Sequence, residues 1–360
     1  MSVIDPTSPA HRPDTLRAGG AAMPVWLARI DGRWLVAAVL LILYPLVATP
    51  FFIFQIGAYA LLLGTLGLSL MVLAGYGGMV SLAQMTIAGV AGYALSILGT
   101  NASGVMGFGW PWWLSVPAAI LIAATASALI GMLAVRTAGI YMIMITLAVA
   151  TAFFYFVRQN YGIFNGFNGF HGVLPPKVLG VDWRSPVPFY YLSLALAVLF
   201  FAATTYAARS TFGLTLQAVR DNPRRMQALG YHVAAHRVFA FFLAGLIAGT
   251  TGVMLTWFNA QISPGTVGVN AAIDVLVVAV VGGIRRPIGP FLGAILFVLL
   301  ENFATDLVGS DRFNTLIGLV FLVIVFVSPD GIVGIGERIA TKTRQTALWT
   351  PGRGASAKNK

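Results

Sequence analysis

The chain has no cysteine among its 360 residues. Disulfide frameworks, cysteine-ligated zinc sites and thiol catalysis are therefore excluded. Charge is also scarce, because Asp, Glu, Lys and Arg together make up only 9% of the residues. A water-soluble domain normally carries well over twice that share of charged side chains on its surface. The composition therefore excludes an ordinary soluble domain and indicates a protein that is solvated by lipid.

Acidic residues are the rarer charged class, with 11 against 22 basic residues and a formal net charge of +11. Such an excess often indicates nucleic-acid binding. Here, however, the basic residues lie in short segments between apolar runs, which is the pattern of the positive-inside rule of membrane proteins. We therefore reject nucleic acid as a partner and expect contacts with membrane lipid.

Motifs for nucleotide, metal and catalysis are also missing. The nearest run to the phosphate-binding pattern GxxxxGK[ST] is GERIATKT at 336–343, which has Thr341 where the second glycine belongs. The four histidines lack metal-binding spacing, and no catalytic triad or carboxylate pair is found. We therefore expect no catalytic residue, no metal and no cofactor bound by this chain.

Long apolar runs make up most of what is present, and 58% of the residues are hydrophobic. A helix needs about 20 such residues to cross a bilayer. We predict an all-α integral membrane protein with a bundle of about ten transmembrane helices. They lie near 34–49, 52–73, 80–99, 113–134, 140–157, 187–207, 236–257, 272–283, 288–304 and 313–328. The eighth run is too short for a straight span, so we expect an irregular or re-entrant piece at its start.

The charges between these runs orient the chain. With the N-terminus inside, the inner segments hold most of the Arg and Lys, whereas charges of both signs nearly cancel in the outer segments. Both termini then lie in the cytoplasm. We divide the chain into a basic, disordered arm at 1–33, a transmembrane domain at 34–330 and a basic cytoplasmic tail at 331–360.

The densest charged stretch lies in an inner segment at 209–236. Asn222 followed by Pro223 predicts the capped start of a helix, and Gly230 predicts its end. Short helices are therefore expected over about 213–220 and 223–229.

These short helices have two predicted sides. Arg220, Arg224 and Arg225 would face water or a partner. A basic loop that only sets topology needs charge but no caps, so the caps favour docking in a groove of a soluble partner. The apolar side would be formed by Leu214, Ala218, Val219, Met226 and Leu229.

Five segments, in order between about residues 40 and 335, resemble the signatures of one family. They are GYGGMVSLAQ (75–84), RTAGIYMIMITLA (136–148), LQAVRDNPRRMQALGYHVAAHRVFAFFLAGLIAG (216–249), GGIRRPIGPFLGA (282–294) and SPDGIVG (328–334). Together they resemble the permease subunits of ABC-type importers of branched-chain amino acids, the LivM type. Ala83, the pair Arg285 and Arg286, and the run at 164–172 depart from that pattern. The same permease type also resembles importers of urea, short amides and aromatic acids.

The resemblance implies a type II-like importer fold in a bacterial inner membrane, with a cytoplasmic coupling-helix loop at 209–236. The implied partners are a second permease of the LivH type, two cytoplasmic ATPases that bind ATP and Mg, and a periplasmic solute-binding protein. The chain would form half of the pore for a branched-chain amino acid or a related small polar solute. Coupling to the ATPases would fall to Arg220, Asp221, Arg224, Arg225, Ala228 and Gly230.

An ion-coupled secondary transporter or channel is the alternative function. Such a carrier would need acidic side chains at mid-membrane. Asp274 and Glu301 lie near the ends of their predicted spans, where they can reach water, and this counts against the alternative.

Two groups of uncharged polar residues are further candidates. Ser81 and Gln84 are three residues apart, which predicts one shared helix face, and they either line the pore or form an interhelical hydrogen bond. Asn165, Asn168 and His171 lie in a glycine-rich outer loop, where they would form a gate or a dock for the binding protein.

Overall fold

The computed structural model describes residues 32–104, 107–137, 139–177 and 180–308, with short pieces at 318–319, 322, 326 and 331–334. The predicted arm at 1–33, the tenth span at 313–328 and the tail at 331–360 therefore lie almost wholly outside the described residues. The chain divides into two units at Val47 and Ala48. The first contains α1 (Gly32–Val47), an apolar helix with Pro45 in its last turn and with Leu40 and Leu46 exposed.

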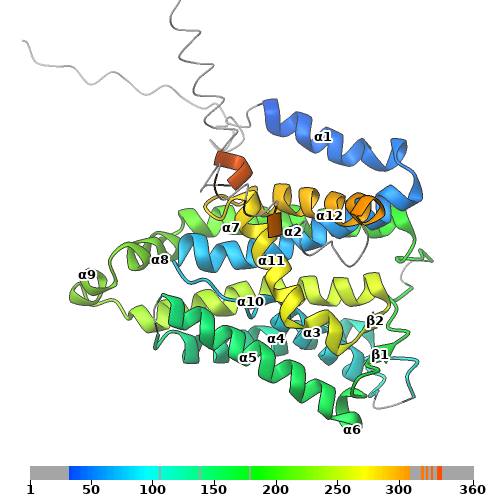
Figure 1. Ribbon diagram of the computed structural model, residues 1–360, viewed down its shortest axis with the longest axis horizontal. Coiled ribbons are helices and arrows are strands. Elements are labelled where there is room, and N and C mark those ends of the chain that lie inside the picture. Colours follow the sequence, from blue (N-terminus) through cyan, green and yellow to red (C-terminus); the bar gives the residue numbers. More distant parts are fainter. Residues whose placement is uncertain are drawn as a thin grey trace, which may run out of the picture. The chain divides into compact units, whose positions relative to one another are not determined.

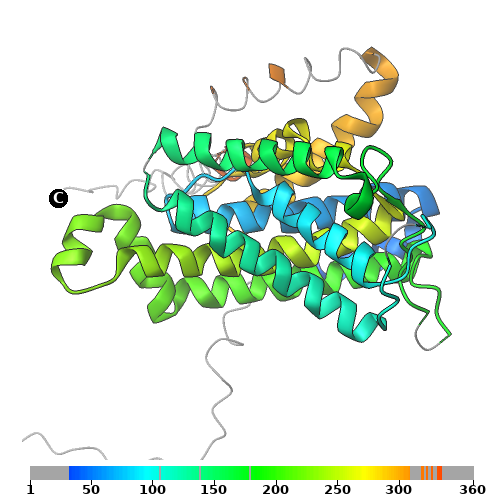
Figure 2. The same cartoon turned by 90° about the horizontal axis from the view of Figure 1, so that it is seen from below.

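The second unit is a bundle of helices (Figures 1 and 2). Its first continuous helix comprises η2 (Phe52–Ala58), α2 (Tyr59–Met71) and η3 (Val72–Tyr76), where η2 and η3 are π-helical. The others are α3 (Gln84–Leu98), α4 (Trp112–Ala134), α5 (Ile140–Gln159), α6 (Tyr161–Phe164), α7 (Pro186–Arg209), α8 (Thr211–Asp221), α9 (Pro223–Ala228), α10 (Val233–Asn259), η4 (Pro264–Val267), α11 (Val269–Gly282) and α12 (Gly289–Val308).

Among the described residues, five helices are long and apolar enough to cross a membrane: 52–76, 112–134, 140–159, 186–209 and 233–259. Apolar segments of 10–17 residues lie at 38–47, 84–98, 269–282 and 289–303. The irregular piece that we expected before the short eighth span is the 3-10 turn η4, which directly precedes α11. The prediction of a span over 80–99 was wrong at its start, since helix begins only at Gln84.

Helix α10 lies at the centre of the bundle and packs closely on α3 and α4. The small residues Gly245 and Gly249 face α4, where a Cβ on Gly249 would lie 2.9 Å from that of Ala123. On its α3 side, a Cβ on Gly252 would overlap the Ala88 carbonyl oxygen. Small residues at these positions let the backbones approach, as in other membrane bundles.

The two ends of this unit differ in structure. At one end α8 and α9 project from the bundle, and at the other β1 (Phe170–His171) and β2 (Gln261–Ile262) form a short antiparallel pair (Figures 1 and 2). In this pair Phe170 lies opposite Ile262 and His171 opposite Gln261. We call residues 210–232, which contain α8 and α9, the elbow.

Candidate functional site

The helix that starts at Phe52 ends at Tyr76, and the chain then runs without regular structure through 77–83 before α3 begins. Most of this interrupted segment is buried. Irregular backbone inside a membrane protein must find its hydrogen-bond partners within the protein. The Met79 amide donates to the Leu73 carbonyl at 2.9 Å, and the Leu82 amide donates to Thr146 Oγ1 of α5 at 3.1 Å. Thr146 therefore helps to fix the conformation of this irregular segment.

Gln84, the first residue of α3, is only 1% exposed. Its Oε1 accepts a hydrogen bond from Ser69 Oγ at 3.0 Å, and its Nε2 has no partner in the described part of the chain. The hydroxyl of Thr86, also 1% exposed, likewise has none there. In the described part of the chain these two buried groups therefore have hydrogen-bonding capacity that is not used at the start of α3.

The predicted shared helix face of Ser81 and Gln84 was wrong, because Ser81 lies before α3 in the irregular segment. Both side chains are buried, which keeps these polar groups away from lipid. Ser81 Oγ accepts from the Ala83 amide at 3.2 Å and so belongs to the turn that leads into the helix.

A cavity of about 270 Å³ extends from the first turn of α3 toward β2, between α2, α3, α10, η4 and α11. Met85 and Gly89 line it on the α3 side. Most of the lining is apolar, and its polar side chains are all uncharged, namely Tyr59, Thr256, Asn259, Gln261 and Thr266. The arrangement suits a small polar solute, because these side chains supply hydrogen bonds without a fixed charge.

The elbow is ordered by its own caps. Ser210 Oγ accepts from the Gly213 amide at 3.3 Å at the start of α8. Asn222 Oδ1 accepts from the Arg225 amide at 3.0 Å at the start of α9, with Pro223 as the first helical residue. Gly230 ends the turn at φ 87°, a conformation that favours glycine. The helices predicted from Asn222, Pro223 and Gly230 are thus confirmed, with bounds of 211–221 and 223–228.

The inner side of the elbow is a small apolar cluster of Val219, Met226 and Val233. The prediction was wrong for Leu214 and Leu229, which are 58% and 65% exposed. Leu214 lies two residues before the buried Leu216, so it points about 200° away around the helix. Leu229 follows the last residue of α9, so it does not lie on the apolar helix face that its spacing predicted.

The outer side of the elbow combines charge with apolar surface. Arg224, Arg225 and Ala228 are exposed, next to Leu229 and the 44%-exposed Tyr231. Arginine and tyrosine are the residue types that protein interfaces use most strongly.

Unlike Arg224 and Arg225, Arg220 does not lie on the outer side of the elbow but contacts the bundle. Its Nη1 donates to the carbonyl oxygen of Gly75, in η3, at 2.6 Å, and its Nε donates to Asp221 Oδ1 at 2.9 Å. Its stem lies over Gly78, where a Cβ would come within 2.6 Å of Arg220 Cγ. Gly78 also has a φ of 65°. Arg220 therefore links the elbow to the residues where the first long helix is interrupted.

At the opposite end, two of the predicted gate or dock residues shape their own loop. Asn165 has a φ of 58°, and its Nδ2 donates to the Gly169 carbonyl at 2.7 Å. The His171 ring lies 3.1 Å from Gln261 Oε1, and its amide donates to Ser103 Oγ at 2.7 Å. Asn168 is exposed.

Asp274 and Glu301 lie in α11 and α12, and both are partly buried. Asp274 is in the second turn of α11, close to the start of its helix as predicted. In the described part of the chain no three His, Asp or Glu side chains come together as a metal site requires.

The roles of Ser69 and Thr146 were not predicted from the sequence. Each is a hydroxyl residue within an apolar run, which was a usable signal. Their partners are distant in sequence, so the signal could not identify the contact.

Buried irregular backbone, a mostly apolar cavity with uncharged polar side chains in its lining and a capped projection are the features of an α-helical, multi-pass membrane transport subunit. The family described as "Branched-chain amino acid transport system / permease component" matches residues 52–327. The chain belongs to this family of permease components, which are transport subunits rather than enzymes.

Named relatives agree with the family match. The chain is 23% identical over 336 residues to the high-affinity branched-chain amino acid transport system permease protein LivM of Escherichia coli, which covers 85% of this chain and 77% of LivM. It is 28% identical over 166 residues to BraD of Pseudomonas aeruginosa, covering 44% and 53% of the two chains. It is 29% identical over 115 residues to the nucleoside ABC transporter permease protein NupC of Lactococcus lactis, covering 32% and 35%. No solved structure matches the chain.

Proposed function

We propose that this chain forms one half of the solute pathway of an ATP-driven importer, and that the elbow receives the motion of the ATPase subunits. The link from Arg220 to the Gly75 carbonyl carries this proposal. It joins the projecting helices to η3, the last part of a long buried helix, directly before the irregular segment 77–83. A displacement of α8 would therefore reach the start of α3, where Gln84 and the cavity lie.

The cavity is the proposed route, for a branched-chain amino acid or a related small polar solute. Its uncharged polar lining supports a neutral or zwitterionic solute, and the relatives' names support branched-chain amino acids. The solute would bind weakly here, because tight binding would stabilise the solute-bound conformation and slow the release of the solute.

The remaining subunits would be a second permease, two ATPases that bind ATP and Mg, and a periplasmic binding protein. The elbow would lie on the cytoplasmic side of a bacterial inner membrane together with both termini, in line with the basic excess of residues 209–237. The outer side of the elbow, with Arg224, Arg225, Leu229 and Tyr231, would contact an ATPase. The relatives named as ABC transporter permeases favour this function over ion-coupled transport.

The test uses the complete importer in proteoliposomes. Changing Arg224 and Arg225 together to Ala is expected to reduce solute-stimulated ATP hydrolysis at least tenfold, equivalent to about 1.4 kcal/mol of lost interface energy. The control changes Lys177 and Arg184 to Ala, which removes the same charge from exposed positions at the other end of the bundle.

Two results would overturn the proposal. One is normal stimulation of ATP hydrolysis in the Arg224 and Arg225 variant. The other is solute accumulation by the purified chain alone, driven by a proton or sodium gradient.

A further inference from the structure

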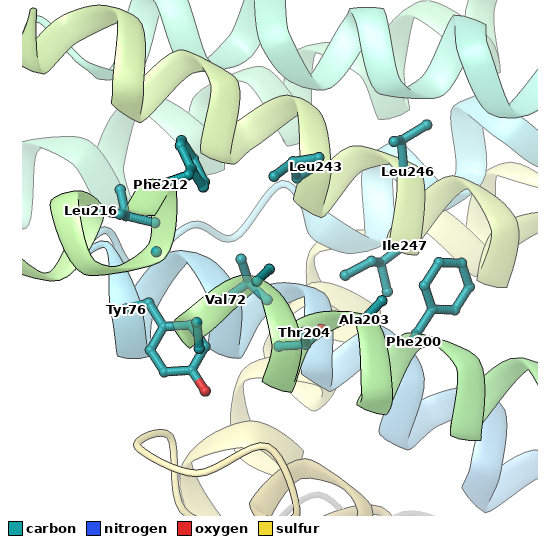
Figure 3. A pocket seen from close by; sticks show the side chains of 13 residues that line it. Val72, Tyr76, Phe200, Ala203, Thr204, Phe212, Leu216, Leu243, Leu246 and Ile247 are labelled. Atoms are coloured by element: carbon teal, nitrogen blue, oxygen red, sulfur yellow. The ribbon is translucent and has the colours of Figure 1, made fainter. Parts of the chain in front are cut away.

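A second, separate hollow lies beside the elbow, between η3, α7, α8 and α10, with a volume of about 190 Å³. Figure 3 shows labelled side chains from these elements around one space, among them Val72, Thr204, Phe212 and Ile247. Its lining is almost entirely apolar, and it is partly open. A polar solute would lose its hydrogen bonds to water there without replacement, so this groove does not suit the transported molecule.

The groove belongs to the surface that lipid would cover. Its walls include α7 and α10, both of which are long and apolar enough to cross a membrane. On α7, Leu199 and Tyr206 are exposed at 58% and 80%. An acyl chain is the apolar occupant that a bilayer supplies at this position.

The end of the groove nearest the elbow carries an exposed basic residue. Arg209, in the last turn of α7, is exposed and directly follows the lining residues Ala207 and Ala208. Between Arg184 and Asp274 the sequence has a single acidic residue, Asp221, and Arg220 already pairs with it. An occupant with a negatively charged head would therefore find attraction and little repulsion at this end.

We propose that this groove binds one acyl chain of an anionic phospholipid, with the phosphate headgroup at Arg209. Lining residues come from both sides of the joint between elbow and bundle, because Tyr76 directly follows Gly75 and Leu216 lies one turn before Arg220. A bound chain would fill the space into which α8 could otherwise move. The binding step itself does not depend on the proposed function.

The test measures phospholipid retained by the purified importer complex, by native mass spectrometry after delipidation and incubation with phosphatidylglycerol or phosphatidylcholine. The wild-type complex is expected to retain phosphatidylglycerol preferentially. Arg209→Ala should reduce this preference about fivefold, since one basic side chain near a membrane surface contributes that much. Arg184→Ala, at the other end of α7, should leave it unchanged.

A matched pair of variants tests the groove itself. Ala203→Phe would fill it, because Ala203 is a lining residue, and should abolish retention. Ala202→Phe adds the same volume at the neighbouring exposed position, which is not part of the lining, and should retain lipid as the wild type does.

Three outcomes would overturn the proposal. Ala203→Phe could retain phosphatidylglycerol as well as Ala202→Phe does, or inorganic phosphate could displace the lipid. A photoreactive residue in place of Leu243 could also crosslink to the second permease instead of to phospholipid, which would make the groove a subunit interface.

Discussion

Two regions of the molecule are held together in opposite ways. One is the crossing of α3 with α10, and the other is the elbow. At the crossing, backbone lies against backbone, because a Cβ on Gly252 would overlap the Ala88 carbonyl and one on Gly92 would overlap Thr256 Oγ1. The elbow is held by two caps, a three-residue apolar cluster and the bond from Arg220 to Gly75. The first arrangement leaves little space for sliding at these glycines, whereas the second leaves most of a projecting surface free.

The difference indicates how movement would pass through the molecule. Close-packed helices shift as one body because their interface has no space for small adjustments. A short element with few polar attachments, here Arg220 to Gly75 and Gln217 to the Ala208 carbonyl, can instead tilt and pull on them. Since Arg220 contacts Gly75 in η3, two residues before the irregular segment 77–83, its pull would act where regular helical hydrogen bonding ends.

The largest effect is expected at the crossing. Gly252→Val would force a branched side chain against the α3 backbone, so the cost should exceed the roughly 1–3 kcal/mol of ordinary overpacking. We expect little folded protein by size-exclusion chromatography and a lower Tm in detergent. Gly162→Val is the control, because a Cβ at Gly162 has no heavy atom within 4 Å. Equal stability of the two variants would show that the crossing is not close-packed.

An intermediate effect is expected at the attachment. Arg220→Ala removes a charge-assisted hydrogen bond of about 1.5–3 kcal/mol, so transport should fall at least tenfold while the ATPases still bind. Arg220→Lys should restore part of the transport. Arg224→Ala should instead weaken ATPase binding, as measured by co-purification. If Arg220→Ala lost the ATPases in the same way, Arg220 would act on the outer side of the elbow.

The smallest effect is expected at the cap of α9. Asn222→Ala removes the acceptor for the Arg225 amide and should destabilise this short helix by about 0.5–2 kcal/mol. Hydrogen exchange should accelerate at residues 223–228 and stay unchanged in α10. Asn222→Asp keeps an acceptor oxygen and should retain protection. Unchanged exchange in the Ala variant would mean that packing, and not the cap, orders the elbow.

Much of this organisation is predictable from the sequence, for identifiable reasons. Hydropathy locates the long helices because burial in lipid requires apolar runs. Asn222, Pro223 and Gly230 predict the elbow because capping is a local property of the chain. The break at 77–83 was predicted only in part: the spans at 52–73 and 80–99 leave a gap between them, but Val80 and Leu82 extended the second apolar run beyond the start of α3.

Long-range contacts account for most of the remainder. Arg220 and Gly75 are 145 residues apart, and nothing in either local sequence indicates the other. The grouping of Arg220 with Arg224 and Arg225 was reasonable from charge alone. A side chain's partner depends on the tertiary fold, and this is the part that a single sequence does not contain.

The Arg220 attachment ends on a main-chain oxygen and not on another side chain. Every residue has a main-chain oxygen, so a substitution at the acceptor position would not by itself remove the acceptor for Arg220. The constraint at Gly75 comes from elsewhere, because a Cβ there would overlap the carbonyl oxygen of Ile284. Chimaeras that exchange the elbow between related permeases should therefore remain functional without compensating substitutions at the acceptor, provided that the arginine is transferred too.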